Sequence, residues 1–177
     1  MTNENRRLDA EAGARTRTVS WQDPFITARL VGPETGLGLL SRMIAGELPP
    51  PPIAQLLGFR LIEVEFGRAV FEFEPAEYHY NPIGVVHGGV AGILLDSAMG
   101  CSVHSTLAAG MGYTTLEFKV NLVRAVTMNT GTIRIEGKLV YGGKRAATAE
   151  GRMIDRDGKI YAHGSTTCMI FPMTTKE

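Results

Sequence analysis

A single acidic residue, Asp96, lies in the middle of a long uncharged stretch of the sequence. It is the only formally charged residue between Glu77 and Glu117. Burying a carboxylate without partners costs free energy, so packing alone would favour an apolar residue or asparagine here. A carboxylate in such surroundings could act as a general base or a nucleophile. The alternative is an acid that is satisfied by hydrogen bonds to a neighbouring helix or turn.

The segment from Asn81 to Gly89 could supply a complementary element. It reads Asn-Pro-Ile-Gly-Val-Val-His-Gly-Gly and leads directly into a predicted helix. The first N–H groups of a helix have no partner within it and lie at the positive end of its dipole. Amides near Gly88 would therefore stabilise a carbonyl oxygen that gains negative charge. The alternative is that Gly88 and Gly89 only allow close packing of helix against sheet.

The spacing of these two features predicts a dimer if they cooperate. His87 and Asp96 are nine residues apart, which is about 13 Å along one helix. One chain cannot easily direct both at the same carbonyl. Two chains with antiparallel helices would bring the Gly88 end of one to Asp96 of the other, giving two equivalent sites across a two-fold axis.

A helix over residues 88–107 must carry both features. Its residues are apolar or small on every side, which predicts a buried helix. Alternating patterns predict strands at 59–66, 68–74, 114–125, 131–140, 144–154 and 159–171. Gly142-Gly143 offers a two-residue turn that needs positive φ, and residues 155–158 offer a longer one, so three sequential antiparallel pairings are expected. This order predicts an α+β fold, with one antiparallel sheet wrapped around one central helix.

The first 52 residues are predicted to form an extension to a domain of residues 53–177. Residues 1–20 mix arginine with polar residues and contain no apolar signal region, which is typical of a mobile tail. Within residues 34–47, Leu37, Leu40 and Ile44 recur at helical spacing. The four prolines Pro49–Pro52 cannot continue that helix, so a stiff connector should follow.

Composition excludes several classes of function. With 44% hydrophobic residues in 177, the chain suits one globular domain. Lysine plus arginine (18) equals aspartate plus glutamate (18), which disfavours binding to nucleic acid or an anionic membrane through bulk charge. Asp96 also argues against a membrane span over residues 88–112.

The remaining reactive residue types are predicted to be structural. Cys101 and Cys168 lack a CxxC partner, which indicates neither a disulfide framework nor a zinc site and fits a reducing cytoplasm. Both are expected to be small buried hydrophobes. No spacing gathers His79, His104 and His163 as metal ligands, so no metal is expected. Core positions are expected at the aromatic and methionine residues Phe71, Phe73, Met99, Met111 and Phe118.

Two motifs carry a family resemblance. The stretch from His87 to Asp96 reads His-Gly-Gly-Val-Ala-Gly-Ile-Leu-Leu-Asp; Asn81-Pro82 precedes it, and Thr114 to Arg124 reads Thr-Thr-Leu-Glu-Phe-Lys-Val-Asn-Leu-Val-Arg. The sequence from about Ile53 to Phe171 resembles the hotdog-fold thioesterases, in particular the phenylacetate-pathway (PaaI-like) branch of the 4-hydroxybenzoyl-CoA thioesterase superfamily. A strand exit commonly written Arg-Pro-Ala in that family is Arg124-Ala125-Val126 here.

The resemblance implies hydrolysis of acyl-CoA thioesters by a homodimer whose two sheets join edge to edge, commonly within a homotetramer. Asp96 takes the position of the catalytic acid and Gly88 that of the backbone donor to the thioester carbonyl. Asn81 and His87 correspond to loop residues that orient the thioester end, and Thr115 to a hydroxyl that helps to hold the water.

The substrate-binding set is completed by five residues. Gly89 and Thr114 lie in the matched motifs, and the cations Arg124, Lys144 and Arg145, near strand ends, suit the phosphates of coenzyme A. No cofactor is expected, because coenzyme A is part of the substrate.

Two other functions stay open. An acyl-thioester hydratase or dehydratase would need a histidine and a carboxylate as a pair, for which His87 could be enlisted. A noncatalytic acyl-CoA sensor would use the same fold without chemistry. A pure binding site gains nothing evident from a carboxylate facing a thioester, so Asp96 favours hydrolysis.

Overall fold

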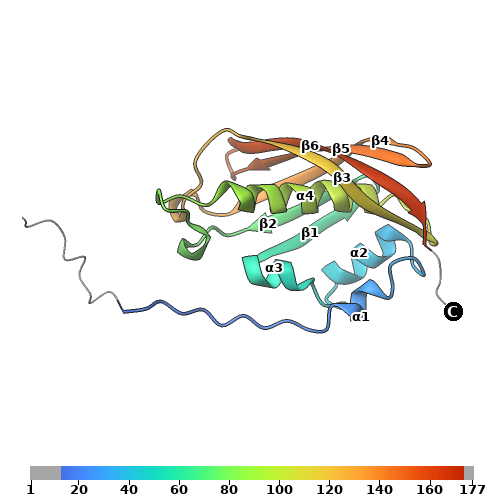
Figure 1. Cartoon of the computed structure of the whole chain (residues 1–177), viewed down its shortest axis with the longest axis horizontal. Helices are drawn as coiled ribbons and strands as arrows, with labels where there is room; N and C mark the ends of the chain where they lie inside the picture. Colours follow the sequence, from blue (N-terminus) through green and yellow to red (C-terminus); the bar gives the residue numbers. More distant parts are fainter. Residues whose placement is uncertain (1–12, 174–177) are drawn as a thin grey trace, which may run out of the picture.

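A sheet of six antiparallel strands wraps around one long helix (Figure 1). The computed structural model describes residues 13–173. The strands are β1 (Phe59–Glu65), β2 (Arg68–Phe73), β3 (Met111–Leu122), β4 (Ile133–Gly142), β5 (Ala146–Ile154) and β6 (Ile160–Pro172). Their order in the sheet is β1-β2-β4-β5-β6-β3, so β1 and β3 are the two edges. The predicted α+β architecture of a sheet around a central helix is confirmed.

The central helix α4 (Gly88–His104) is shorter than the predicted 88–107. After His104 the backbone tightens into a turn, in which the N–H groups of Thr106 and Leu107 donate to the carbonyls three residues earlier, of Val103 and His104. Most of α4 is buried, but one stripe is not covered by the chain itself. Along it Gly89 and Ile93 are exposed, and Asp96 and Ser97 are half-buried. The expectation of a helix buried on every side is wrong for this stripe.

A row of glycines lets the sheet approach α4 closely. Gly137, Gly151 and Gly164 pair with one another across β4, β5 and β6. A Cβ at Gly137 would lie 2.2 Å from the carbonyl oxygen of Ala98, and one at Gly151 would lie 2.9 Å from Cγ of Met99. Side chains at these two positions would therefore push the helix away from the sheet.

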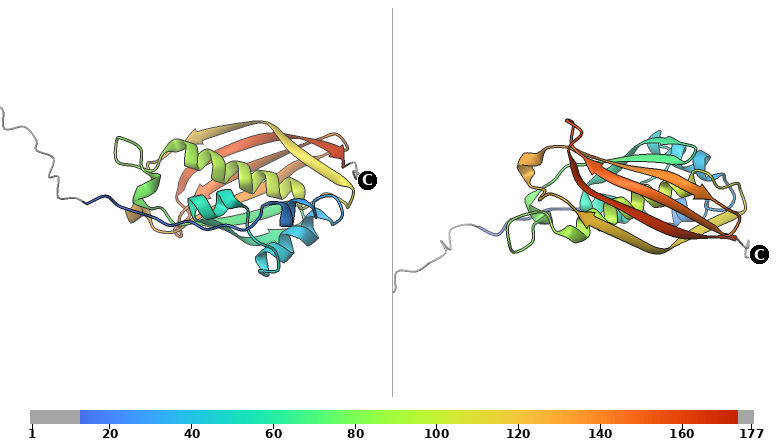
Figure 2. Two further views of the ribbon diagram at one scale, coloured as in Figure 1. Left: turned by 60° about the horizontal axis from the view of Figure 1, so that its bottom comes forward. Right: turned by 90° about the horizontal axis from the view of Figure 1, so that it is seen from above.

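Three sequential pairings form, namely β1 with β2, β4 with β5 and β5 with β6. Strand β3 instead crosses the molecule to pair with β6 (Figure 2, right). The turn between β5 and β6 is held by Asp155, whose side chain accepts from the N–H groups of Asp157 and Lys159. The predicted positive-φ turn at Gly142-Gly143 is wrong: neither glycine has a positive φ, and residues 143–145 make the connection.

The N-terminal region contributes three short helices, α1 (Phe25–Ala28), α2 (Gly36–Ile44) and α3 (Pro52–Leu57). Helix α2 lies within the predicted 34–47. It starts because the Thr35 hydroxyl accepts from the N–H of Gly38, and it buries Leu39 and Leu40. The proline connector is shorter than expected, because Pro52 begins α3, where a missing N–H costs nothing. Of the predicted mobile tail, residues 1–12 lie outside the described part of the chain.

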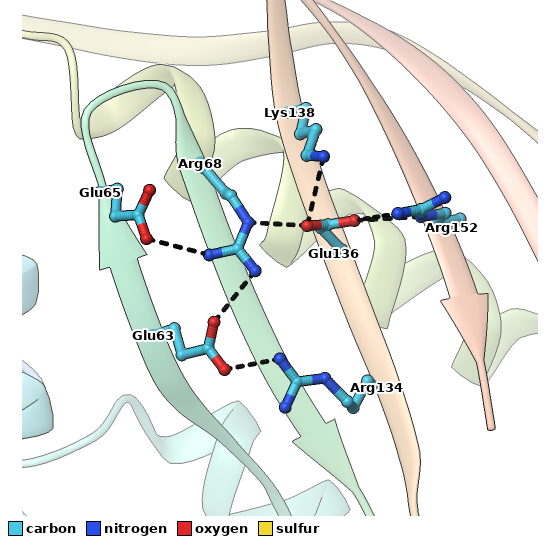
Figure 3. A network of polar contacts seen from close by, with 7 residues as sticks. All are labelled: Glu63, Glu65, Arg68, Arg134, Glu136, Lys138 and Arg152. Carbon is cyan, nitrogen blue, oxygen red and sulfur yellow. Dashed lines mark hydrogen bonds and ion pairs between the residues drawn. The ribbon is translucent and has the colours of Figure 1, made fainter. Parts of the chain in front are cut away.

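The outer face of the sheet carries a network of ion pairs across β1, β2, β4 and β5 (Figure 3). Arg68 bridges Glu63 and Glu136, at 3.0 and 2.7 Å. Arg134 pairs with Glu63, and Arg152 pairs with Glu136. The network makes this face polar, whereas the opposite face packs on α4.

Candidate active site

Asn81 shapes the loop that precedes α4. Its side-chain oxygen accepts from the N–H groups of Ile83 (3.1 Å) and Val85 (3.3 Å), and its own N–H donates to the carbonyl of Val85 at 2.8 Å. These bonds use the oxygen of the amide. The side-chain NH₂ has no acceptor within residues 13–173 and is available to a ligand.

The first amide of α4 is free. His87 caps the helix through Nδ1, which accepts from the N–H of Gly89 at 2.9 Å, and its carbonyl accepts from Val90. The N–H of Gly88 between them has no acceptor among the described residues. A Cβ on residue 88 would lie 2.6 Å from Cδ1 of Leu122, so glycine also makes room for β3. The free amide and the helix dipole can stabilise an oxyanion here.

A cavity of about 310 Å³ opens beside this amide. Four predicted site residues line it: Asn81, His87, Gly88 and Arg124. Its apolar wall includes Val86, Leu122, Val126, Met153, Tyr161 and Ala162. The last three come from β5 and β6, and nothing in their strand pattern marked them as site residues. Arg124 donates to the carbonyl of Ile160 at the rim.

Asp96 lies further along α4 and has one partner. The Thr115 hydroxyl on β3 donates to Oδ1 of Asp96 at 3.0 Å, and both residues are half-buried. Within residues 13–173 the carboxylate has no other hydrogen bond and no ion pair. Its remaining lone pairs can accept a proton or attack a carbonyl.

A β-bulge sets Thr115 against the helix. Thr115 pairs with Cys168 and Glu117 with Thr167, so Leu116 is an extra residue in β3. Tyr113 and Thr115 face α4 before the bulge, and even-numbered residues such as Phe118 face it afterwards, with the Phe118 ring over Gly92. Bulges change which side chains a strand presents to one face. Phe118 was predicted to be core but is 45% exposed, because it lies at the uncovered edge.

The groups around Asp96 are held in their neutral forms. Burial raises the pKa of Cys101 to about 12, and the nearby Asp96 carboxylate adds to this. Burial also raises the pKa of Cys168 and of Tyr113, again with a contribution from Asp96. Thiols in this state are poor nucleophiles. The two thiols and the Tyr113 hydroxyl are therefore poor candidates for a nucleophile at this position.

One chain does not bring the two halves of the candidate site together. Gly88 and Asp96 are eight residues apart on a continuous helix, about 12 Å along its axis. The cavity at Gly88 is not lined by Asp96. Gly88 and Asp96 both lie beside the uncovered stripe of α4, which runs from Gly89 through Ile93 to Asp96.

The other predicted binding residues lie apart. Gly89 and Thr114 are exposed and outside the cavity lining. Lys144 and Arg145 are exposed in the connection between β4 and β5. Lys144 borders a depression with Thr106, just beyond the C-terminal end of α4. These two cations thus lie at the opposite end of the helix from Gly88.

Two further features are absent from residues 13–173. No three histidine, cysteine or acidic side chains there converge as a metal site. In the same part of the chain no helix has the length and apolar character to cross a membrane.

An antiparallel sheet of six strands wrapped around one central helix defines a hotdog-fold protein. Residues 83–162 match the family described as the thioesterase superfamily. A solved structure from Ralstonia eutropha, described as a proposed thioesterase related to phenylacetic acid degradation, is 30% identical. Its TM-score is 0.66, and the match covers 73% of this chain and 98% of that one.

Proteins related in sequence are also named as hydrolases. A Saccharolobus solfataricus protein, named as a proposed esterase, is 33% identical over 110 residues, which are 62% of this chain and 76% of the relative. The 1,4-dihydroxy-2-naphthoyl-CoA hydrolase of Listeria monocytogenes is 23% identical over 108 residues, 61% of this chain and 86% of that enzyme. The chain belongs to the thioesterase superfamily.

Proposed function

We propose that the protein hydrolyses acyl-CoA thioesters to the free acid and coenzyme A. The observation that carries this proposal is the Asp96 carboxylate, which lies on the uncovered stripe of α4 and which, among the described residues, is bound by the Thr115 hydroxyl alone. The similar Listeria protein, a CoA-thioester hydrolase by name, supports the same chemistry.

The active form in this proposal is a homodimer with two shared sites. The edge strand β3 exposes Leu116, Phe118 and Leu122, and the neighbouring stripe of α4 exposes Ile93. A second copy with its helix antiparallel would cover these side chains and would bring the partner's Asp96 to the Gly88 amide. Two such dimers would form the homotetramer that the resemblance implies.

In this site the Gly88 N–H donates to the thioester carbonyl and stabilises the oxyanion. The partner's Asp96 takes a proton from a water that attacks the carbonyl carbon, or attacks that carbon itself to form a mixed anhydride that water then cleaves. The C–S bond breaks in either route, and the sulfur of coenzyme A leaves and is protonated. Thr115 holds the carboxylate in place, and the Asn81 amide and His87 orient the thioester end.

Cations at both ends of α4 would bind the phosphates of coenzyme A. Arg124 borders the cavity beside Gly88. In an antiparallel dimer that aligns Gly88 with the partner's Asp96, the C-terminal end of the partner's helix extends past the loop at Asn81. Lys144 and Arg145 lie near that end, so the partner would supply them.

A thiol-release assay over aryl, short-chain and long-chain acyl-CoAs tests the function. We expect release from at least one class. Binding of acyl-CoA without release from any class would instead indicate the noncatalytic sensor. Loss of the double bond of an enoyl-CoA without free thiol would indicate the hydratase.

A further inference from the structure

We propose that His79, which lies outside the cavity, is the positioning residue that fixes the direction of the Gly88 amide. The inference rests on the proposed function, in which that amide polarises the thioester. It concerns a histidine that does not line the cavity itself.

Both nitrogens of the His79 ring are committed to backbone partners. The N–H of Ala76 donates to Nδ1 at 3.0 Å, and Nε2 lies 2.9 Å from the carbonyl oxygen of Leu57. Because an amide can only donate, Nδ1 must be the acceptor, and Nε2 carries the proton that it donates to Leu57. The ring therefore holds one tautomer and joins the end of α3 to the turn before the loop.

The backbone of His79 holds the residue next to Gly88. Its carbonyl accepts from the N–H of His87 at 2.8 Å. One residue earlier, the N–H of Val86 donates to the carbonyl of Val126 at 2.9 Å. The N–H of Gly88 lies in the plane of the peptide that joins residues 87 and 88. The hydrogen bond from the His87 N–H to the His79 carbonyl restrains residue 87, at one end of that peptide.

The His79 ring is buried and packs against two aromatic rings. The side chain is 3% exposed and lies against Phe73, with ring centroids 4.8 Å apart, and against Tyr78, at 4.2 Å. On its outer side Tyr78 is covered by the Arg17 guanidinium, 4.0 Å from the ring centroid. Arg17 also donates to the carbonyl of Gln55 in α3. The His79 imidazole thus lies where three parts of the chain meet: the N-terminal segment at Arg17, helix α3, and the loop before α4.

Loss of this positioning should affect kcat rather than KM. An oxyanion donor acts only if it is aimed at the oxyanion before the reaction, and misplacement by about 1 Å can cost about a hundredfold in rate. Loss of the His79 bonds should therefore lower kcat. It should leave KM nearly unchanged, because the cavity walls and the cations stay in place.

Three substitutions test the proposal by kcat and KM for the best acyl-CoA. His79→Phe keeps the stacked ring but removes both ring hydrogen bonds, and we expect kcat to fall by about tenfold to a hundredfold. The oxygen of His79→Asn can still accept from Ala76, and the NH₂ of His79→Gln can still donate to Leu57. Each should recover part of the loss. His163→Phe, at an exposed histidine on β6, is the control and should match the wild type.

A second measurement separates the possible failures. In the ¹H–¹⁵N spectrum, His79→Asn should shift the Gly88 amide and speed hydrogen exchange of the His87 amide, whereas His163→Phe should change neither. Unchanged kcat in folded His79→Phe and His79→Asn, or unchanged amides at 87 and 88, overturns the proposal. If the wild-type protein releases no thiol, the proposed function fails, while the amide shifts still decide whether His79 positions Gly88.

Discussion

Two carboxylates on opposite sides of the sheet, Glu136 on β4 and Asp96 on α4, have contrasting environments. On the outer face, Glu136 accepts from Arg68 at 2.7 Å and from Arg152 at 2.7 Å, with Lys138 at 3.5 Å (Figure 3). On the inner side, Asp96 of α4 accepts from the Thr115 hydroxyl and from no other group within residues 13–173. Only 11% of the Glu136 side chain is exposed and Asp96 is half-buried, so both acids are partly shielded from water.

The two acids differ in how many hydrogen-bond donors they already bind. Burial pushes the pKa of Glu136 upward, but hydrogen bonds from Arg68 and Arg152 outweigh it and lower the pKa to about 2. That carboxylate has no spare capacity for a substrate. On the inner face, the carboxylate of Asp96 and the amide of Gly88 keep unused hydrogen-bonding capacity, which a second chain and a thioester would fill.

Substitution of the inner acid should have the largest effect. Asp96→Asn keeps the shape and can still accept from Thr115, but it loses the base and nucleophile, so we expect kcat to fall by at least about a thousandfold. The midpoint of thermal unfolding and acyl-CoA binding should change little. Turnover at the wild-type rate would remove Asp96 from the mechanism.

The free amide can be deleted by a single substitution with a matched control. Gly88→Pro removes the N–H at the first helical position, where proline is tolerated, and His87 already has the extended backbone that precedes proline well. We expect kcat to fall by about a hundredfold to a thousandfold. Gly88→Ala adds the same Cβ against Leu122 but retains the amide. It should be clearly more active, and equal loss in both would assign the effect to packing.

Mixing two inactive variants tests whether the inner site is shared. If Asp96→Asn and Gly88→Pro subunits exchange freely, half of the dimers are mixed, and one of the two sites in each is intact. About a quarter of the wild-type activity per chain should therefore return. No recovery in a mixture shown to contain mixed dimers would mean that each chain uses its own Asp96.

Substitution of the outer acid should affect stability but not turnover. Glu136→Gln leaves Arg68 and Arg152 without their carboxylate, and we expect a loss of about 2 kcal/mol in the free energy of unfolding, since the partners are partly exposed. Because the folded pKa is depressed, this stabilisation is present above the ordinary pKa of 4.5 and is lost as the pH falls toward 2. Urea unfolding from pH 7 to pH 3 measures both effects. A fall in kcat of the folded Glu136→Gln variant would contradict the view that this acid on the outer face is purely structural.

The smallest change in free energy should come from removing the hydroxyl that donates to Asp96. Thr115→Val preserves the side-chain volume and removes the hydrogen bond, so kcat should fall by about tenfold, or about 1.4 kcal/mol. Thr115→Ser retains the hydroxyl and should recover most of the rate. If valine and serine behave alike, the bond seen at 3.0 Å does not contribute to turnover.

Several features of the fold could be predicted because they depend on local chemistry. The start of α4 at Gly88 is predicted from the run of apolar and small residues that begins there, and the pairing of β1 with β2 from the alternating patterns over 59–66 and 68–74. Other features could not. Nothing local distinguishes pairing of β3 with β4 from pairing with β6, and the bulge at Leu116 depends on the strand alongside it.

Residue types alone place one acid in an uncharged stretch and a glycine-rich loop at the start of the same helix. The rise of a helix makes their separation too long for one carbonyl. Folding is needed to bring Thr115 to Asp96, to line the cavity with residues of β5 and β6, and to bond His79 to the loop. Such contacts join residues far apart in the chain, and packing of the whole sheet around α4 sets them.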